Sequence, residues 1–258
     1  MAVKKTKTLA EVTTVTTINT DQYIPVTDAY GNVTKVSLES LKSAIFGGMG
    51  IDSINEGVYI ACHNTIEGNR ATLIELSKWN YYKERGEVAD GVALVQGDKI
   101  LVIAPTDAVL KMDETENVVS GIAIKSNTTE AVSDWDGKNN TEQLLNNPNF
   151  NSPDRAIGFC AQYSRTNPNG IGLTSGSWWL PSCGELMFIF ANIYRINYAL
   201  SLIQGATKID SSNSHWSSST AKNNMMWTIY PGLRKVNSVY KGNMFRVRPV
   251  STIINHGE

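Results

Sequence analysis

The sequence has few cysteines and no long apolar run, and each shortage excludes a class of protein. The 258 residues include three cysteines, an odd and widely spaced set that fits neither a disulfide framework nor a zinc knuckle. We expect Cys62, Cys160 and Cys183 to be buried thiols that pack as small apolar side chains. No apolar stretch is long enough to cross a bilayer, so membrane insertion is not expected.

Charge is also scarce. Only 18% of the residues are charged, and the formal net charge at pH 7 is −1. Such a chain creates no field that would draw it to nucleic acid or to an anionic membrane, so neither partner is expected. The first 11 residues contain lysines but lack the apolar run of a signal peptide. We therefore expect the protein to be made in, and at first to stay in, a cytoplasm.

Residues 1–48 form a separate small module. Two short β-prone runs, 23–26 and 33–36, flank a polar tip that ends in Gly-Asn, which predicts a hairpin. Ser37 can cap a short helix after it. So few residues bury too little surface to fold alone, and the module should contact copies of itself or another protein. The side chains expected to make these contacts are Tyr23, Ile24, Val26, Val33, Val36, Leu38, Leu41 and Ile45.

The rest of the chain predicts an α+β fold. We expect a connecting β segment at 49–84, a domain at 85–252 and a tail at 253–258. Apolar runs predict strands, with a tight hairpin at 95–99; the runs lie at 57–60, 91–95, 99–104, 121–124, 215–217, 226–230, 236–240 and 245–250. One helix should start at Ser152-Pro153-Asp154, with Ala156, Cys160 and Tyr163 on one face.

A second helix has the clearest local signal. Ser182 and Glu185 have the spacing of a capping box. An apolar stripe then continues along one helical face through Leu186, Ile189, Phe190, Ile193 and Ile196. We expect this helix to be part of the core. Two β regions that flank a pair of helices favour an α+β fold over a doubly wound sheet.

Several motifs occur in an order that resembles a known fold. They are D-W-D-G-K-N-N-T at 134–141, W-W-L-P-S-C-G-E-L at 178–186, W-S-S-S-T at 216–220 and V-R-P-V at 247–250. Together with the strands at 91–92 and 100–104, they resemble the variant C-type-lectin fold of formylglycine-generating-enzyme relatives, of a domain family common in gut bacteria, and of variable receptor-binding proteins of tailed phages. The resemblance covers about residues 85–252.

The N-terminal module has a resemblance of its own. The pattern I-P-V-T-D-x-x-G-N-V-x-K-V-S-L-x-x-L, which begins at Ile24, looks like the attachment segment of phage fibre proteins. Those proteins are usually trimers, so the resemblance implies a homotrimer.

The resemblance does not bring recognisable chemistry with it. The E-P-N, Q-P-D and W-N-D motifs of calcium-dependent lectins do not occur, and 146–149 and 166–169, which contain Asn-Pro-Asn, are expected to be turns. Asp134 and Asp136 could hold a lone cation, but a solvated turn beside Trp135 is the favoured interpretation. Formylglycine-generating enzymes use a cysteine pair near the C-terminus, whereas the last cysteine here is Cys183.

The three histidines also give no sign of a catalytic site. His63, His215 and His256 are scattered, without a carboxylate or cysteine partner at a telling spacing. We therefore expect no catalytic centre, no metal and no cofactor.

A recognition surface is the remaining possibility. Aromatic, Asn and Arg side chains gather between 213 and 243, a composition that suits polar-ligand and protein recognition. We expect Trp216 and Trp227 to be core. The candidate ligand-binding residues are Asn223, Asn224, Tyr230, Arg234, Asn237, Tyr240 and Asn243.

These observations predict a structural protein of a tailed-phage virion, assembled in the host cytoplasm. Residues 1–48 would bind another virion protein and drive trimer formation, while the lectin-fold head binds host-surface glycan or protein. A bacterial surface or secreted lectin-fold adhesin is the alternative, and a degenerate enzyme of the formylglycine-generating type is a third possibility. All three require the stretch around Trp179 and the stretch ending at Val250 to meet in one body.

Overall fold

The structure is a computed structural model that describes residues 54–97, 99–114, 122–222 and 224–253, together with the backbone of 23–27 and 33–37. The chain divides into two compact units, residues 1–49 and 50–258. In the first unit, β1 (Tyr23–Thr27) and β2 (Val33–Ser37) pair antiparallel, with Ile24 opposite Val36. The predicted hairpin is confirmed. The predicted helix with Leu38, Leu41 and Ile45 lies outside the described residues.

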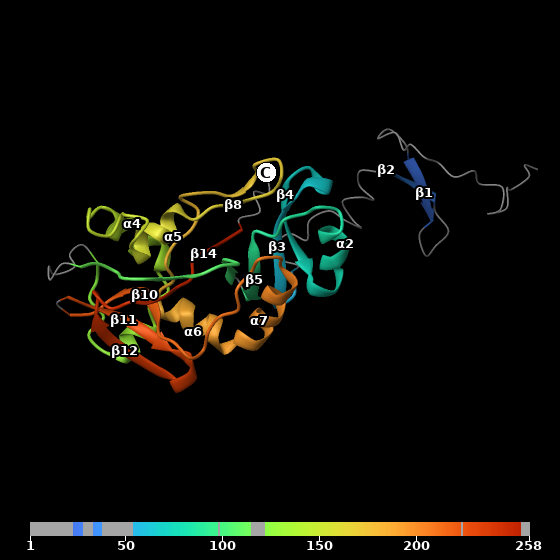
Figure 1. Cartoon of the computed structure of the whole chain (residues 1–258). Coiled ribbons are helices and arrows are strands. Elements are labelled where there is room, and N and C mark those ends of the chain that lie inside the picture. Colours follow the sequence, from blue (N-terminus) through green and yellow to red (C-terminus); the bar gives the residue numbers. More distant parts are fainter. Residues whose placement is uncertain are drawn as a thin grey trace, which may run out of the picture. The chain divides into compact units, whose positions relative to one another are not determined.

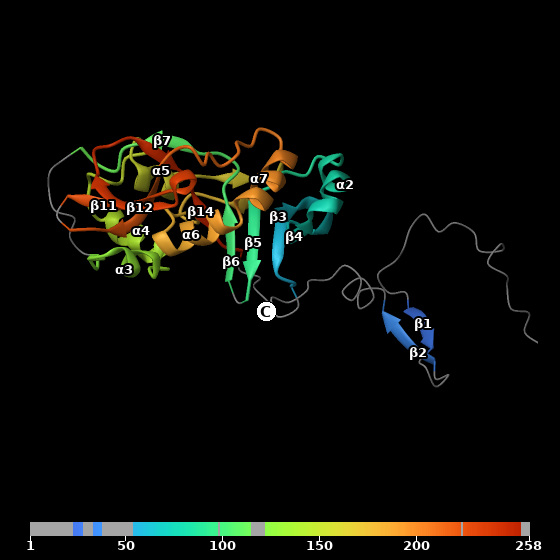
Figure 2. The ribbon, with the colours of Figure 1, turned by 90° about the horizontal axis from the view of Figure 1, so that it is seen from below.

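The second unit contains a five-stranded antiparallel sheet in the order β14-β6-β5-β3-β4 (Figure 2). Its strands are β3 (Gly57–Asn64), β4 (Arg70–Glu75), β5 (Gly91–Gln96), β6 (Lys99–Ile103) and β14 (Val250–Ser251). Gln96 pairs with Lys99 and Gly97 has φ 57°, so the predicted tight hairpin is confirmed. Since β3 pairs directly with β5, the predicted domain boundary at residue 85 falls within this sheet.

A second five-stranded sheet has the order β12-β11-β10-β13-β7. Its strands are β7 (Ala108–Leu110), β10 (His215–Thr220), β11 (Met225–Tyr230), β12 (Lys235–Tyr240) and β13 (Phe245–Val247). β10 and β13 run parallel, while the other neighbours are antiparallel. Two short strands, β8 (Arg165–Thr166) and β9 (Gly172–Leu173), form a separate pair.

Two strand predictions were wrong. The run 245–250 is not one strand, because the chain leaves the second sheet after Val247 and joins the first at Val250. Arg248 fills the gap and donates hydrogen bonds to the carbonyl groups of Ala104 and Pro105, at 2.9 Å each. The described part of the run 121–124 forms no strand and is not paired into either sheet.

The helices lie between and around the sheets (Figure 1). The α-helices are α2 (Trp79–Lys83), α3 (Thr128–Val132), α4 (Gly137–Leu145), α5 (Ala156–Gln162), α6 (Cys183–Ala191) and α7 (Ile193–Leu202). Short 3-10 turns occur at η3 (Thr65–Glu67), η4 (Leu76–Lys78) and η5 (Pro231–Leu233).

The capping box of α6 is confirmed, since Ser182 accepts from the Glu185 backbone and the Glu185 carboxylate accepts from the Ser182 backbone. The apolar stripe that follows was predicted as one helix, yet it is divided at Asn192, where α6 ends. The other predicted start was also displaced. The Ser152 hydroxyl accepts from the Asp154 backbone within a turn, and α5 begins only at Ala156.

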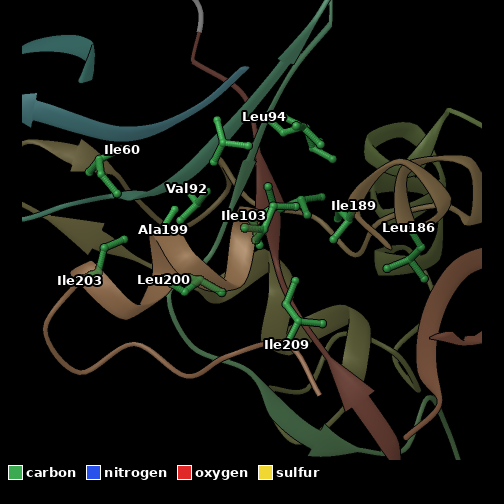
Figure 3. Close-up of a cluster of buried hydrophobic side chains, with 14 of the residues drawn as sticks. Ile60, Val92, Leu94, Ile103, Leu186, Ile189, Ala199, Leu200, Ile203 and Ile209 are labelled. Carbon is green, nitrogen blue, oxygen red and sulfur yellow. The ribbon is translucent and has the colours of Figure 1, made fainter. Parts of the chain in front are cut away.

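The largest core cluster lies where α6 and α7 pack on the two sheets (Figure 3). Ile60, Val92 and Ile103 extend from the first sheet toward Ala199 and Leu200 of α7. Trp227 and Ile229 of β11 join the same cluster from the second sheet. The other face of the second sheet packs Trp216, Met226 and Val247 against α4 and α5 residues. The cysteines are buried free thiols, as predicted.

Trp179 and Val250 join the middle of the chain to its C-terminal stretch. The backbone N–H of each donates to the carbonyl of the other, at 2.8 and 2.9 Å. The predicted meeting of these two stretches in one sheet-and-helix body is confirmed, and the unit is an α+β fold. In the described part of the chain, every helix is too short or too polar to span a bilayer.

Candidate functional site

The candidate site is the β11–β12 hairpin, which forms one edge of the second sheet. β12 pairs with β11 from Lys235 to Tyr240 and has no second neighbour among the described strands. No β12 residue is fully buried, whereas all six residues of β10 are. Figure 1 shows β10, β11 and β12 side by side, at the opposite end of the unit from β3 and β4.

The strand β10 gives this hairpin a rigid support. The Ser217 hydroxyl donates to the Trp227 carbonyl at 2.7 Å, which ties β10 to β11 through a side chain. On the helical side, the Ser219 hydroxyl donates to Asp134 at 2.7 Å and accepts from the Cys183 backbone at 3.0 Å. The predicted core positions of Trp216 and Trp227 are confirmed, at 1% and 7% exposed. Trp216 also donates from its ring nitrogen to the Leu110 carbonyl at 2.9 Å.

One end of the hairpin is the η5 turn. Arg234 closes it in the left-handed region, with φ 51° and ψ 39°, and its backbone N–H donates to the Pro231 carbonyl. Gly232 donates to the Ser211 carbonyl at 2.8 Å, which fixes the turn against the loop before β10. In that loop, hydrogen bonds from Ser212 and Asn213 hold the pKa of Asp210 well below its usual range. The turn is therefore held by backbone contacts, while the Arg234 side chain is exposed.

The other end is held by a buried ion pair. Lys241, directly after β12, is 1% exposed, and its Nζ lies 2.7 Å from an Asp113 carboxylate oxygen. The Lys241 backbone also donates to Asn224, which anchors the start of β11. Breaking a buried pair of this kind leaves an uncompensated charge in the core. This end of the hairpin should therefore be as rigid as the η5 end.

The predicted ligand-binding residues lie along this hairpin and do not converge on one point. Tyr230 and Arg234 are at the η5 end, and Asn224, Tyr240 and Asn243 are at the other. The strand rise places the two ends about 17 Å apart. The register also puts Tyr230 and Asn237 on one face of the hairpin and Tyr240 on the other. Asn223 lies outside the described residues.

The six described candidates share one property. None of their side chains forms a hydrogen bond or ion pair with another described residue. The hydrogen bonds made by Asn224, Asn237, Tyr240 and Asn243 all use the backbone atoms of these residues. Their polar groups are thus unpaired within the described fold, and they form a dispersed surface over both faces and both ends of the hairpin. Such a surface suits a polymer or a protein better than a small molecule enclosed in a cleft.

The Asp134 prediction was wrong in part. Asp134 is buried, and it accepts from Asn140 at 3.0 Å and from Ser219 at 2.7 Å, with Lys125 3.9 Å away. It is a structural carboxylate and not part of a solvated turn, because the α3–α4 connection folds onto β10. Asp136 and Trp135 are exposed, as expected for a turn. The two Asn-Pro-Asn stretches are turns, as predicted.

Other buried titratable groups belong to the scaffold. Burial raises the pKa of Glu185 to about 7, although hydrogen bonds from Ser182 and Trp179 oppose the shift. Burial lowers the pKa of His215 to about 4, and the His215 ring nitrogen Nε2 lies 2.7 Å from the Asp210 carbonyl. Burial also raises the pKa of the Cys183 thiol to about 11, so this thiol is not an activated nucleophile.

One polar pair was missed. His63 Nδ1 lies 2.7 Å from a carboxylate oxygen of the buried Asp90, so His63 does have a carboxylate partner. The two residues are 27 positions apart and meet only because β3 ends beside the residue that precedes β5. No spacing in the sequence signals such a contact. Across the described ranges, no three His, Cys, Asp or Glu side chains gather as metal ligands.

No protein-family model and no curated protein matches the chain. Among solved structures, a crystal structure of a fimbrial protein from Bacteroides ovatus ATCC 8483 aligns with a TM-score of 0.45 and 16% sequence identity. The alignment covers 90% of this chain and 49% of that one, so the chain spans about half the length of the fimbrial protein. This likeness is too weak to assign a fold family or a function.

Proposed function

We propose that the second unit is a C-type-lectin-like head without a catalytic centre, which binds a host-surface glycan or protein through the β11–β12 hairpin. The observation that carries this proposal is the set of six recognition-type side chains that have no partner of their own on a rigidly supported sheet edge. An ordered surface with unsatisfied polar groups loses little conformational entropy when it binds.

The N-terminal unit supplies the second half of the proposal. The β1–β2 hairpin and the fibre-like pattern around it favour attachment to a virion, and the whole chain is then a fibre or decoration protein of a tailed phage, assembled as a homotrimer in the host cytoplasm. Ile24 pairs with Val36 in the register of the two strands, and these two residues with Val26 are the ones we propose for the contact.

Virion attachment is tested by mass spectrometry and immuno-electron microscopy of purified particles, with light scattering of the purified protein for its oligomeric state. We expect the chain in particles and a trimer in solution. The double variant Ile24→Asp/Val36→Asp should be monomeric and absent from particles. Lys35→Ala, at the alternating position opposite Pro25, is the matched control and should behave as the parent does.

The outcomes separate the alternatives. A monomeric parent protein that is never found in particles contradicts the virion assignment. Detection on the bacterial cell surface in cells without phage supports the adhesin instead. Copper binding with oxygen consumption by the purified protein would support the degenerate enzyme.

A further inference from the structure

A cavity of about 310 Å³ lies outside the hairpin, where α2, the chain leading to β5, β8 and the end of α7 meet. Its volume is at the lower end of the range for small-molecule sites. The residues that line it are Trp79, Lys83, Gly86, Glu87, Val88, Ala89, Arg165, Ile203 and Gln204. None belongs to the β11–β12 hairpin.

The apolar wall of this cavity is fixed in place. Trp79 and Ile203 are 2% and 5% exposed and belong to the main core cluster. The Trp79 ring nitrogen donates to the Leu202 carbonyl at 3.2 Å, which ties α2 to the last turn of α7. In Figure 3, Ile203 lies beside Ala199 and Leu200 on the α7 side of the sheet. The cavity is therefore built by packed elements and needs no rearrangement to form.

Arg165 lines the cavity beside this wall and is held in one orientation. Its Nε donates to the Ala89 carbonyl at 2.9 Å, which fixes the plane of the guanidinium group. In the described part of the chain, neither Arg165 nor Lys83 has a carboxylate within 4 Å. The two Nη groups thus remain available for the bidentate contact that arginine makes with a carboxylate.

Glu87 is the acidic residue of the lining, and it is buried and hydrogen-bonded to η3. Its carboxylate oxygens accept from the Thr65 backbone at 3.0 and 3.1 Å and from the Ile66 backbone at 3.3 Å. The Thr65 hydroxyl is a further donor to it. These donors are neutral groups of η3, so Glu87 keeps its negative charge, but it forms no ion pair with Arg165 or Lys83 among the described residues. Two cations against one carboxylate leave the lining with an excess of positive charge, which favours an anion.

We propose that this cavity binds a small organic acid of about the size of one acidic sugar. Its carboxylate would pair with the Arg165 fork, with Lys83 adding positive charge and Gln204 reaching hydroxyl groups, while Trp79 and Ile203 form the buried floor beneath the ligand. This inference goes beyond the proposed function, because the cavity and the hairpin share no residue. Either site can fail without the other.

The test is isothermal titration calorimetry of the full chain with glucuronate, glucose and a 6-sulfated N-acetylglucosamine. We expect glucuronate to bind about tenfold or more tightly than glucose, because only the acid makes the charge-assisted pair. Arg165→Gln and Lys83→Gln should each weaken glucuronate binding, with Arg165→Gln giving the larger loss. Lys83 is exposed, so its variant tests the site even if Arg165→Gln folds poorly.

Arg85→Gln is the matched control. Arg85 is an exposed cation near the end of α2 that is not part of the lining, and it contacts the Tyr81 ring and carbonyl instead. Its variant should bind glucuronate as the parent does. Equal binding of glucose and glucuronate, no binding of glucuronate at millimolar concentration, or full binding by Lys83→Gln and Arg165→Gln would each overturn the proposal. Binding of the sulfated sugar alone would overturn the carboxylate assignment.

Discussion

β10 and β12 are six-residue strands of one sheet, separated only by β11, and both are rich in polar side chains. Every β10 residue is buried, and Ser217 and Ser219 donate to groups on β11 and on the α3–α4 connection. In β12, by contrast, the side chains of Asn237 and Tyr240 form no hydrogen bond with another described residue. The two polar strands thus differ in burial: β10 lies inside the fold, although the Ser218 and Thr220 hydroxyls have no described partner there, whereas no β12 residue is fully buried.

The largest expected effect is a difference in the free energy of unfolding between a β10 variant and a β12 variant. Trp216→Ala in β10 removes a fully buried aromatic side chain and should lower the free energy of unfolding by about 3–5 kcal/mol. Asn237→Ala in β12 should change it by less than about 0.5 kcal/mol, because a partly exposed side chain without partners is removed. Urea denaturation of both variants measures the difference. Similar losses would mean that β12 is as much a part of the scaffold as β10.

The next largest effect should come from Asp134, the buried carboxylate that contacts β10. Asp134→Ala leaves the Ser219 hydroxyl and the Asn140 amide without their acceptor in the interior, and we expect a loss of about 2–4 kcal/mol. Asp136→Ala, two residues away and exposed, is the control and should cost about 1 kcal/mol or less, because it loses only an exposed bond from Asn139 at the start of α4. Thermal and urea denaturation compare the two. A near-neutral Asp134→Ala would show that the β10 support does not depend on this carboxylate.

Glu185 should give the scaffold a dependence on pH. Its folded pKa of about 7 is raised above the ordinary value of 4.5. Its contribution to stability is therefore fully present below pH 4.5 and is lost as the pH rises through 7. Glu185→Gln stays neutral, so the stability of the variant relative to the parent should increase by about 3 kcal/mol between pH 4 and 8. Urea titrations at both values test this, and an unchanged difference contradicts it.

His215 in β10 should act in the opposite direction. Its folded pKa of about 4 lies below the ordinary value of 6.5. Its contribution is therefore present above pH 6.5 and is lost as the pH falls through 4. His215→Gln lacks this titration, so its stability relative to the parent should rise by up to about 3 kcal/mol as the pH falls from 7 to 4. The stabilities of Glu185→Gln and His215→Gln relative to the parent, measured by denaturation and plotted against pH, should slope in opposite directions. Parallel slopes would mean that at least one assignment is wrong.

Local signals in the sequence predicted much of this fold. The Ser182–Glu185 capping box, the Gly97 hairpin and the β1–β2 hairpin each depend on residues close in sequence, so their chemistry is visible there. The meeting of Trp179 with Val250 was also predicted, but from a resemblance and not from local pattern.

Long-range contacts account for what was missed. Asp134 is structural because β10 and α4 close over it, and His63 finds Asp90 only through sheet pairing. Likewise, Arg165 lines a cavity with residues from three other segments. The candidate ligand residues were chosen from one stretch of the sequence, and their division between two faces and two ends of the hairpin required the strand register.

The most direct test of the proposed recognition surface is adsorption of the purified full chain to intact cells of the proposed host. The triple variant Arg234→Ala/Asn237→Ala/Asn243→Ala is compared with Lys138→Ala/Asn139→Ala/Glu142→Ala, three exposed residues of α4. We predict that the hairpin variant folds normally and loses adsorption about tenfold or more, whereas the α4 variant adsorbs as the parent does. Undiminished adsorption by a folded hairpin variant would contradict the assignment of this sheet edge as the binding surface.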